Sequence, residues 1–122
     1  TPLMWATAHK HKEVVRALLE HPGINVNEPG PDGFSALHVA VDYKIVDILK
    51  MFLEDPRVDI STTNGFGITP LIGAILGRRP DIVQMILQHP RLDIHAPTRD
   101  KKTPLHRAAF LKDATILKML LQ

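Results

Sequence analysis

The chain of 122 residues contains no cysteine, which excludes disulfide scaffolds, cysteine-based zinc sites and thiol catalysis. Aromatic residues make up only 5% of the sequence, and no apolar run approaches the roughly 18 residues that a membrane span requires. Neither an H-E-x-x-H metal motif nor a glycine-rich phosphate loop occurs. The remaining composition, 44% apolar and 23% charged, is ordinary for one folded domain.

Net charge is also small, and it is unevenly divided along the chain. The total is +2, but residues 1–77 carry six basic and nine acidic side chains, whereas residues 78–122 carry nine basic and four acidic ones. The basic excess in the second part is too dilute to resemble a nucleic-acid footprint. We therefore predict no specific nucleic-acid partner and no membrane insertion.

A repeat of 34 residues runs through the whole chain. Four similar segments, TPLMWA, SALHVA, TPLIGA and TPLHRA, begin at Thr1, Ser35, Thr69 and Thr103. Each segment has leucine at its third position and alanine at its sixth, which indicates repeated units that stack on one another. The units are residues 1–34, 35–68, 69–102 and a truncated 103–122, and together they form one domain, 1–122.

Each unit predicts two helices followed by a loop. The Thr or Ser at the start can cap a helix, and the proline that follows it in three units suits the first helical position. In the second unit this first helix should cover residues 36–43. The segment behind the second helix alternates apolar and polar residues, which is typical of a short extended arm. The second helices should start near Glu13, Asp47, Asp81 and Thr115 and end before Pro22, Pro56 and Pro90.

The first-helix motifs point to a known family. TPLHRA at residues 103–108 matches the pattern T-P-L-H-x-A in full, and SALHVA at 35–40 is a close variant. Met4 and Ile72 stand in place of the histidine in the other two units. With these motifs the chain resembles the ankyrin repeat over all four units. The resemblance implies an all-α repeat fold, an ankyrin-type solenoid of helix-turn-helix units with projecting hairpin-like loops.

Two features depart from the family pattern. The period is 34 residues, whereas the family usually has about 33. The glycine that the family places between its two helices is replaced by a cation in every unit. Because a left-handed helix end is less favourable without glycine, we expect these inter-helix turns to differ from those of the family. The cations form a stripe made of Lys10, Lys44, Arg78 and Lys112.

A 34-residue period also occurs in tetratricopeptide repeats, whose units are almost wholly helical. Here residues 55–68 and their equivalents contain proline, glycine and alternating polar residues that a helix does not accept. The ankyrin interpretation is therefore favoured.

The resemblance implies a protein–protein interaction scaffold that binds through a concave face of first helices and through loop tips. Of the six aromatic side chains, only Phe52 falls in the core column of a second helix. Aromatic residues on such a face are typical interface anchors, although packing against neighbouring loops is an alternative role. The candidate partner-binding residues are Trp5, Phe34, Tyr43, Phe66, Ile68, Leu76, Phe110 and Leu111, with Arg99, Lys102 and Arg107 as basic companions.

Two other functions stay open. The repeats also fit a regulatory or targeting segment of a larger enzyme or channel. The Lys/Arg stripe fits a binder of anionic ligands, although such cations also complement helix ends. A chain without cysteine is compatible with a reducing compartment, and we expect a cytoplasmic or nuclear location.

Seven histidines occur, but their pattern does not indicate catalysis. The resemblance implies that His38 and His106 form structural hydrogen bonds near the start of the first helix in their units. His9 and His11 are two residues apart, so on a helix their side chains should diverge and make a poor metal pair. We therefore predict that the chain is not an enzyme and has no cofactor and no metal site.

Both ends of the sequence lie inside a unit. The last unit stops at Gln122, within a second helix whose apolar residues have no following unit to cover them. Terminal repeats normally carry a polar outer face. We therefore expect the chain to be a piece of a longer array. On its own it should be marginally stable or self-associate through the uncapped fourth repeat.

Overall fold

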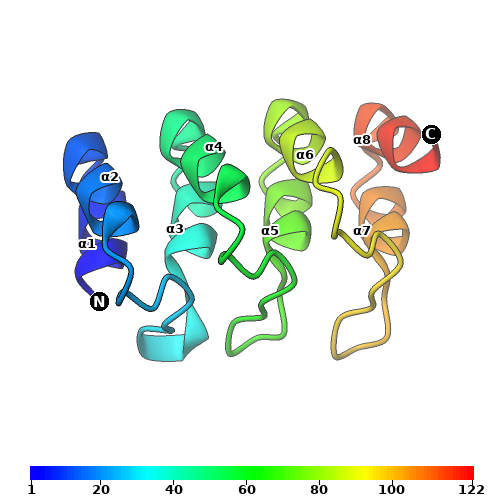
Figure 1. The fold of residues 1–122 in the computed structure, drawn as a ribbon. Coiled ribbons are helices and arrows are strands. Elements are labelled where there is room, and N and C mark those ends of the chain that lie inside the picture. The colour runs from blue at the N-terminus through cyan, green and yellow to red at the C-terminus, as the bar shows by residue number, and fades with distance from the viewer.

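A computed structural model describes all residues, 1–122, as a row of helix pairs. The four pairs stand side by side from the N-terminus to the C-terminus, and the three long loops project on the same side of the row (Figure 1). A short 3-10 turn, Pro31–Gly33, forms the tip of the first loop. The helices are α1 Pro2–Ala8, α2 Lys12–Glu20, α3 Ala36–Asp42, α4 Val46–Glu54, α5 Pro70–Leu76, α6 Pro80–Leu87, α7 Pro104–Phe110 and α8 Ala114–Leu121.

Helix boundaries follow the 34-residue period without drift. The first helices start at residues 2, 36, 70 and 104, and the second helices start at residues 12, 46, 80 and 114. The second helices therefore begin one residue before the predicted positions. The predicted helix over 36–43 ends at Asp42, because Tyr43 forms its C-terminal cap.

The predicted caps at the starts of the first helices are confirmed. The side-chain oxygen of the leading Thr or Ser accepts a hydrogen bond from the backbone N–H three residues later in every unit. This bond satisfies one of the free N–H groups that open each helix. The donor–acceptor distances are 3.1 Å from Met4, 3.3 Å from His38, 3.2 Å from Ile72 and 3.4 Å from His106.

The turns between paired helices keep a left-handed residue despite the missing glycine. Lys10, Lys44, Arg78 and Lys112 have φ angles of 60°, 59°, 55° and 58°. In the second unit the N–H of Lys44 donates to the carbonyl of Val41, and the N–H of the next residue donates to that of Ala40. This pair of bonds is a Schellman motif, and it needs the left-handed conformation. The expectation that the cations would change these turns is therefore wrong.

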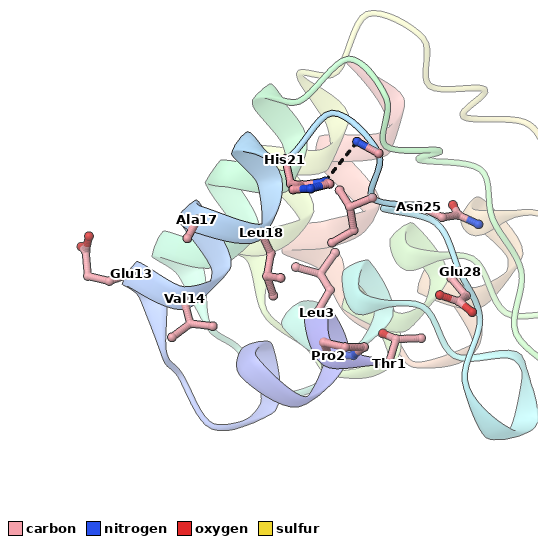
Figure 2. Close-up of a pocket in the computed structure, with 12 residues that line it drawn as sticks. Thr1, Pro2, Leu3, Glu13, Val14, Ala17, Leu18, His21, Asn25 and Glu28 are labelled. Carbon is pink, nitrogen blue, oxygen red and sulfur yellow. Dashed lines mark hydrogen bonds between the residues drawn. The ribbon is translucent and has the colours of Figure 1, made fainter.

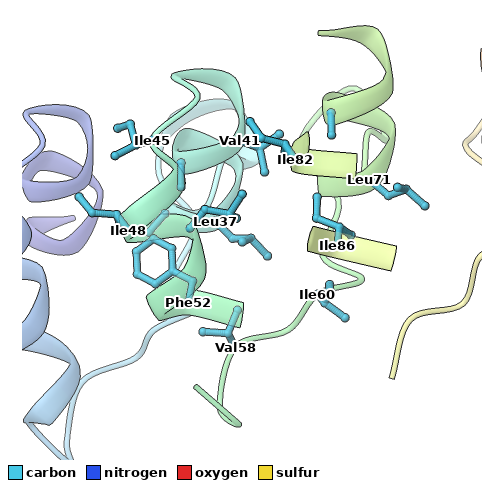
Figure 3. Close-up of a cluster of buried hydrophobic side chains, with 14 of the residues drawn as sticks. Leu37, Val41, Ile45, Ile48, Phe52, Val58, Ile60, Leu71, Ile82 and Ile86 are labelled. Carbon is cyan, nitrogen blue, oxygen red and sulfur yellow. The ribbon is translucent and has the colours of Figure 1, made fainter. Parts of the chain in front are cut away.

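Apolar faces of adjacent pairs pack together and form one continuous core of 23 residues. Each first helix packs against the next first helix, and each second helix against the next second helix. In the middle of the stack Ile48 and Phe52 of α4 and Ile82 and Ile86 of α6 are buried, with Ile48 on the side of α4 that faces the first pair and Ile82 on the side of α6 that faces the second (Figure 3). Since a single pair would leave these side chains in water, stacking supplies most of the hydrophobic stabilisation.

The segments behind the second helices do not form β-strands. Residues such as Val58 and Ile60 are buried against the core, as their alternation predicts, but the backbone makes successive turns. Each loop tip is closed by one N–H to carbonyl bond across four residues, from Gly30 to Phe34 at 2.8 Å in the first loop. The equivalent bonds run from Asn64 to Ile68 at 3.1 Å and from Thr98 to Lys102 at 2.9 Å. The extended arm predicted from the alternation is therefore a chain of turns.

None of the helices combines the length and the apolar character that spanning a bilayer requires.

The strained turns predict a stabilising substitution. Lys44→Gly should raise the free energy of unfolding by about 0.5–1 kcal/mol, because glycine adopts the left-handed conformation without a Cβ penalty. Urea unfolding followed by circular dichroism measures the change. Lys50→Gly is the matched control, since Lys50 is an exposed lysine inside α4, where glycine should destabilise by about 1 kcal/mol. Destabilisation by both variants would show that the turn stores no strain.

Candidate protein-binding face

The exposed sides of α1, α3, α5 and α7, together with the loop tips, form a surface that we call the first-helix face. The first helices of the first three units bury the third, sixth and seventh positions, as Leu37, Ala40 and Val41 do in α3, whereas α7 buries only Ala108 of these three positions. The fifth, eighth and ninth positions then lie on the opposite side of the helix. These positions hold Trp5 in the first unit and Tyr43 in the second.

Large apolar side chains are exposed on this face. Their exposed fractions lie between 45% for Leu76 and 81% for Phe110, whereas Phe52 in the core is 1% exposed. Large rigid side chains lose little entropy when a partner immobilises them, and they dominate the energy of many interfaces. The five most prominent are Trp5, Tyr43, Phe66, Leu76 and Phe110.

Three of the eight apolar candidate residues are half-buried instead of exposed. Phe34, Ile68 and Leu111 each pack partly against the stack. The Phe34 ring meets the Phe66 ring edge to face, with centroids 6.5 Å apart, and it meets the His38 ring at 5.8 Å. The packing role weighed for the aromatics therefore applies in part to Phe34, which also supports the ring of Phe66.

Trp5 lies in a stack of three rings at the N-terminal end of the face. Its ring is parallel to that of His9 at a centroid distance of 3.8 Å, and the His9 ring is 6.0 Å from that of His11. The predicted divergence of the two histidines is wrong, because both follow the end of α1 and the left-handed Lys10 lies between them. No group of three potential metal-ligating side chains is present anywhere in the chain.

The three basic candidates, Arg99, Lys102 and Arg107, differ in the number of hydrogen bonds that their side chains form within the protein. The Arg107 guanidinium is half-buried and donates to Thr98 at 3.1 Å and to Asp100 at 2.8 Å. Arg99 donates to the carbonyl of Gly65 in the neighbouring loop at 3.0 Å. Lys102 is exposed and lies 6.0 Å from the centroid of the Phe110 ring. Arg107 and Arg99 therefore join loops, and Lys102 is the most accessible of the three cations.

The Lys/Arg stripe lies beside the first-helix face, at the turns that join paired helices. All four of its side chains are exposed. The Arg78 guanidinium makes one long contact, 3.4 Å, to the carbonyl of Leu111 in the next unit. The stripe is thus a regular row of accessible positive charge.

Comparison with known proteins identifies the architecture. The sequence matches the model of a family described as ankyrin repeats (3 copies), once over residues 1–64 and again over residues 54–122. The chain belongs to the ankyrin repeat family. The predicted family and the all-helical solenoid are therefore confirmed. A search of curated proteins finds no match to the chain.

Ankyrin repeats are generally protein–protein interaction modules and are typically not catalytic. Their exposed residues are therefore considered first as contacts for another protein.

In this ankyrin repeat domain His38 joins two units. Its Nδ1 accepts from the backbone N–H of Ser35 at 3.2 Å, so the proton lies on Nε2, which donates to the carbonyl of Ile68 at 2.9 Å. His106 makes the same capping contacts with Thr103, but within residues 1–122 its Nε2 forms no hydrogen bond to another unit. Burial lowers the pKa of His38, and its bond to the Ile68 carbonyl partly opposes that effect.

Sequence reasoning missed a second set of links between the ankyrin units. The Asn27 side chain donates to the carbonyl of Arg57 at 2.8 Å and accepts from the N–H of Asp59 at 2.7 Å. The Arg57 guanidinium donates back to the carbonyls of Leu19 and His21 at the end of α2. Arg91, 34 residues later, also reaches back to the preceding unit, but there it donates to the carbonyls of Pro56 at 3.1 Å and Val58 at 3.4 Å. The sequence signal that could have indicated these links is the arginine that recurs after 34 residues, at positions 57 and 91.

The His38 bridge predicts a pH effect on stability. Because its folded pKa lies below the unfolded value of about 6.5, the unfolded chain binds the proton first, and the free energy of unfolding falls as pH drops below that value. His38→Met, the residue type of the first unit, should cost about 1–3 kcal/mol at neutral pH and flatten this dependence. Urea unfolding between neutral and mildly acidic pH measures both effects.

His106→Met is the control for this prediction, since it removes the cap without an inter-unit bond and should cost less. His89, whose pKa is lowered by partial burial and by Arg91, keeps its own contribution in both variants. Equal losses for the two variants, with an unchanged pH slope, would contradict the bridge.

Proposed function

We propose that this domain binds a partner protein through the first-helix face and the loop tips. One observation carries the proposal: every aromatic side chain except Phe52 lies on this face, and four of the five are more than half exposed. A monomeric surface with no partner rarely gathers its large apolar residues in this way. A role as the regulatory or targeting segment of a larger enzyme or channel would use the same face.

The fourth unit adds a charge preference to this face. Lys101 and Lys102 are exposed, Lys102 lies beside Phe110, and neither lysine forms an ion pair within the protein. A partner segment with apolar residues for the aromatic rings and acidic residues near the fourth unit would be complementary. Arg107 is less available, because Asp100 already accepts from it.

Peptides selected from a display library of random sequences against the whole chain test this proposal. Phe66→Ala and Tyr43→Ala should each lower the affinity of the chain for the recovered peptides about tenfold or more, because truncating an interface anchor removes its buried area. Titration calorimetry measures the affinities. Val46→Ala on the outer side of α4 should leave them unchanged. Peptides that bind all three variants equally would place the interface elsewhere.

The exposed row of cations favours a second candidate, the binding of an anionic ligand along the Lys/Arg stripe. That function predicts an affinity that falls steeply with salt and with charge removal at Lys10 and Lys112, and it predicts indifference to Phe66→Ala. Binding by the first-helix face should instead change little with salt.

We further propose that the two ends of the stack associate with each other in separate copies of the chain. A groove of about 660 Å³ opens at the N-terminal end, where Val14 and Leu18 of α2 and Leu3 of α1 line one surface (Figure 2). Val14 is 50% exposed, whereas Ile48 in the same column is 1% exposed. At the other end Leu121 is exposed in α8. Inside the stack, residues of these two columns pack on the core, as Ile48 and Leu53 do.

Sedimentation velocity over a concentration series tests this association. The weight-average sedimentation coefficient of residues 1–122 should rise with concentration, since head-to-tail contacts do not close. Val14→Lys should reduce the rise, because it buries a charge in the new contact, and Val46→Lys should not. A single monomeric species at every concentration would contradict the proposal.

A further inference from the structure

The middle of the first-helix face contains a groove between the second and third units. Its volume is about 360 Å³, and it lies between α3 and α5. Phe34 and Ile68 from the loops and Leu76 from α5 provide apolar walls, while Asp42 at the end of α3 provides a carboxylate. The groove is internal to the stack, so it does not depend on what lies beyond either end of the chain.

Glycine at position 73 opens this groove. The column holds Trp5, Val39 and Arg107 in the other units, and only the third unit has no side chain there. A Cβ built at Gly73 would lie 3.5 Å from Oδ1 of Asp42 and 3.6 Å from a methyl group of Val41, which are ordinary contact distances. The space beside the Asp42 carboxylate therefore exists because residue 73 is glycine, although nothing in the backbone of α5 requires one.

The Asp42 carboxylate has no partner inside the protein. It is exposed, accepts no side-chain hydrogen bond and forms no ion pair, whereas Arg79, which also lines the groove, is held by Asp81 at 2.7 Å. Partial burial of the carboxylate raises the pKa of Asp42, and the charge that His38 carries when protonated opposes this effect. Lys44 and Arg79 also line the groove, but neither forms an ion pair with Asp42. An unpaired carboxylate with apolar walls is best stabilised by a donor that carries positive charge.

We propose that this groove takes an arginine or lysine side chain of the partner protein. The inference rests on the proposed function of the first-helix face. The cationic group hydrogen-bonds the Asp42 carboxylate in the space above Gly73, and its aliphatic stem packs on Phe34, Ile68 and Leu76. A bound partner then runs from a basic residue at the second and third units towards acidic residues at the fourth, which fixes its direction along the stack.

The test uses dodecapeptides selected from a random display library against residues 1–122, with affinities from titration calorimetry. Recovered peptides should share a basic residue, and both Asp42→Asn and Gly73→Ala should weaken them about tenfold. Replacing the basic residue of the peptide should cost little further in Asp42→Asn, because the two groups act as a pair. Gly73→Ala fills the space and favours helix, so a folding defect does not explain its effect.

Glu20→Gln is the matched control, since it removes an exposed carboxylate from α2, outside the groove, and should leave affinity unchanged. Peptides that lose affinity for Phe66→Ala but keep it for Asp42→Asn and Gly73→Ala would overturn the groove inference and leave the proposed function standing. A library that yields no binders, or binders indifferent to all of these substitutions, would overturn both.

Discussion

Burial of apolar side chains between neighbouring units is the interaction on which the rest of this structure depends. No single helix pair encloses a core, and the side chains that are fully buried, such as Phe52 and Ile86, lie where one pair meets the next. Polar links follow the same direction. His38 reaches the carbonyl of Ile68, and Asn27 reaches the backbone of residues 57 and 59. Stability and shape therefore arise from one interface repeated along the chain.

This construction also determines what is left exposed. Each first helix has seven residues, about two turns, and stacking uses one side of it. The other side needs no particular residue for folding, so its sequence is free to vary between units. In this chain that side carries an aromatic ring in the first, second and fourth units. In the third unit it carries Gly73, which lies next to the unpaired Asp42. The features that distinguish the units from one another lie on the face proposed to bind.

Much of the fold could be predicted from the sequence, because the 34-residue period aligns caps, leucine columns and helix-ending prolines. Local geometry was harder. Lys44 keeps its left-handed conformation because two backbone hydrogen bonds of a Schellman motif hold it. These bonds involve no side chain, so the residue types do not predict them. The prediction that His9 and His11 diverge assumed that both lie on a helix, whereas α1 ends at Ala8 and both histidines follow it.

In the candidate site, too, some features could be predicted from the sequence and others could not. Exposure of Tyr43, Phe66 and Phe110 agrees with their columns, but the engagement of Arg107 by Thr98 and Asp100 depends on how a loop folds back. The space above Gly73 could not be predicted either. It depends on the position of Asp42 in the preceding unit. The sequence alone does not show which side chain of one unit lies next to a glycine of the following unit.

The central claim is that the stack leaves its aromatic rings uncovered for a partner. Hydroxyl-radical footprinting, analysed for each residue by mass spectrometry, tests it most directly on the free chain and on its complex with a selected peptide. The account predicts rapid modification of Trp5, Tyr43, Phe66 and Phe110, slow modification of Phe52, and protection of several exposed rings in the complex. Rings modified as slowly as Phe52 in the free chain, or unprotected in the complex, would contradict it.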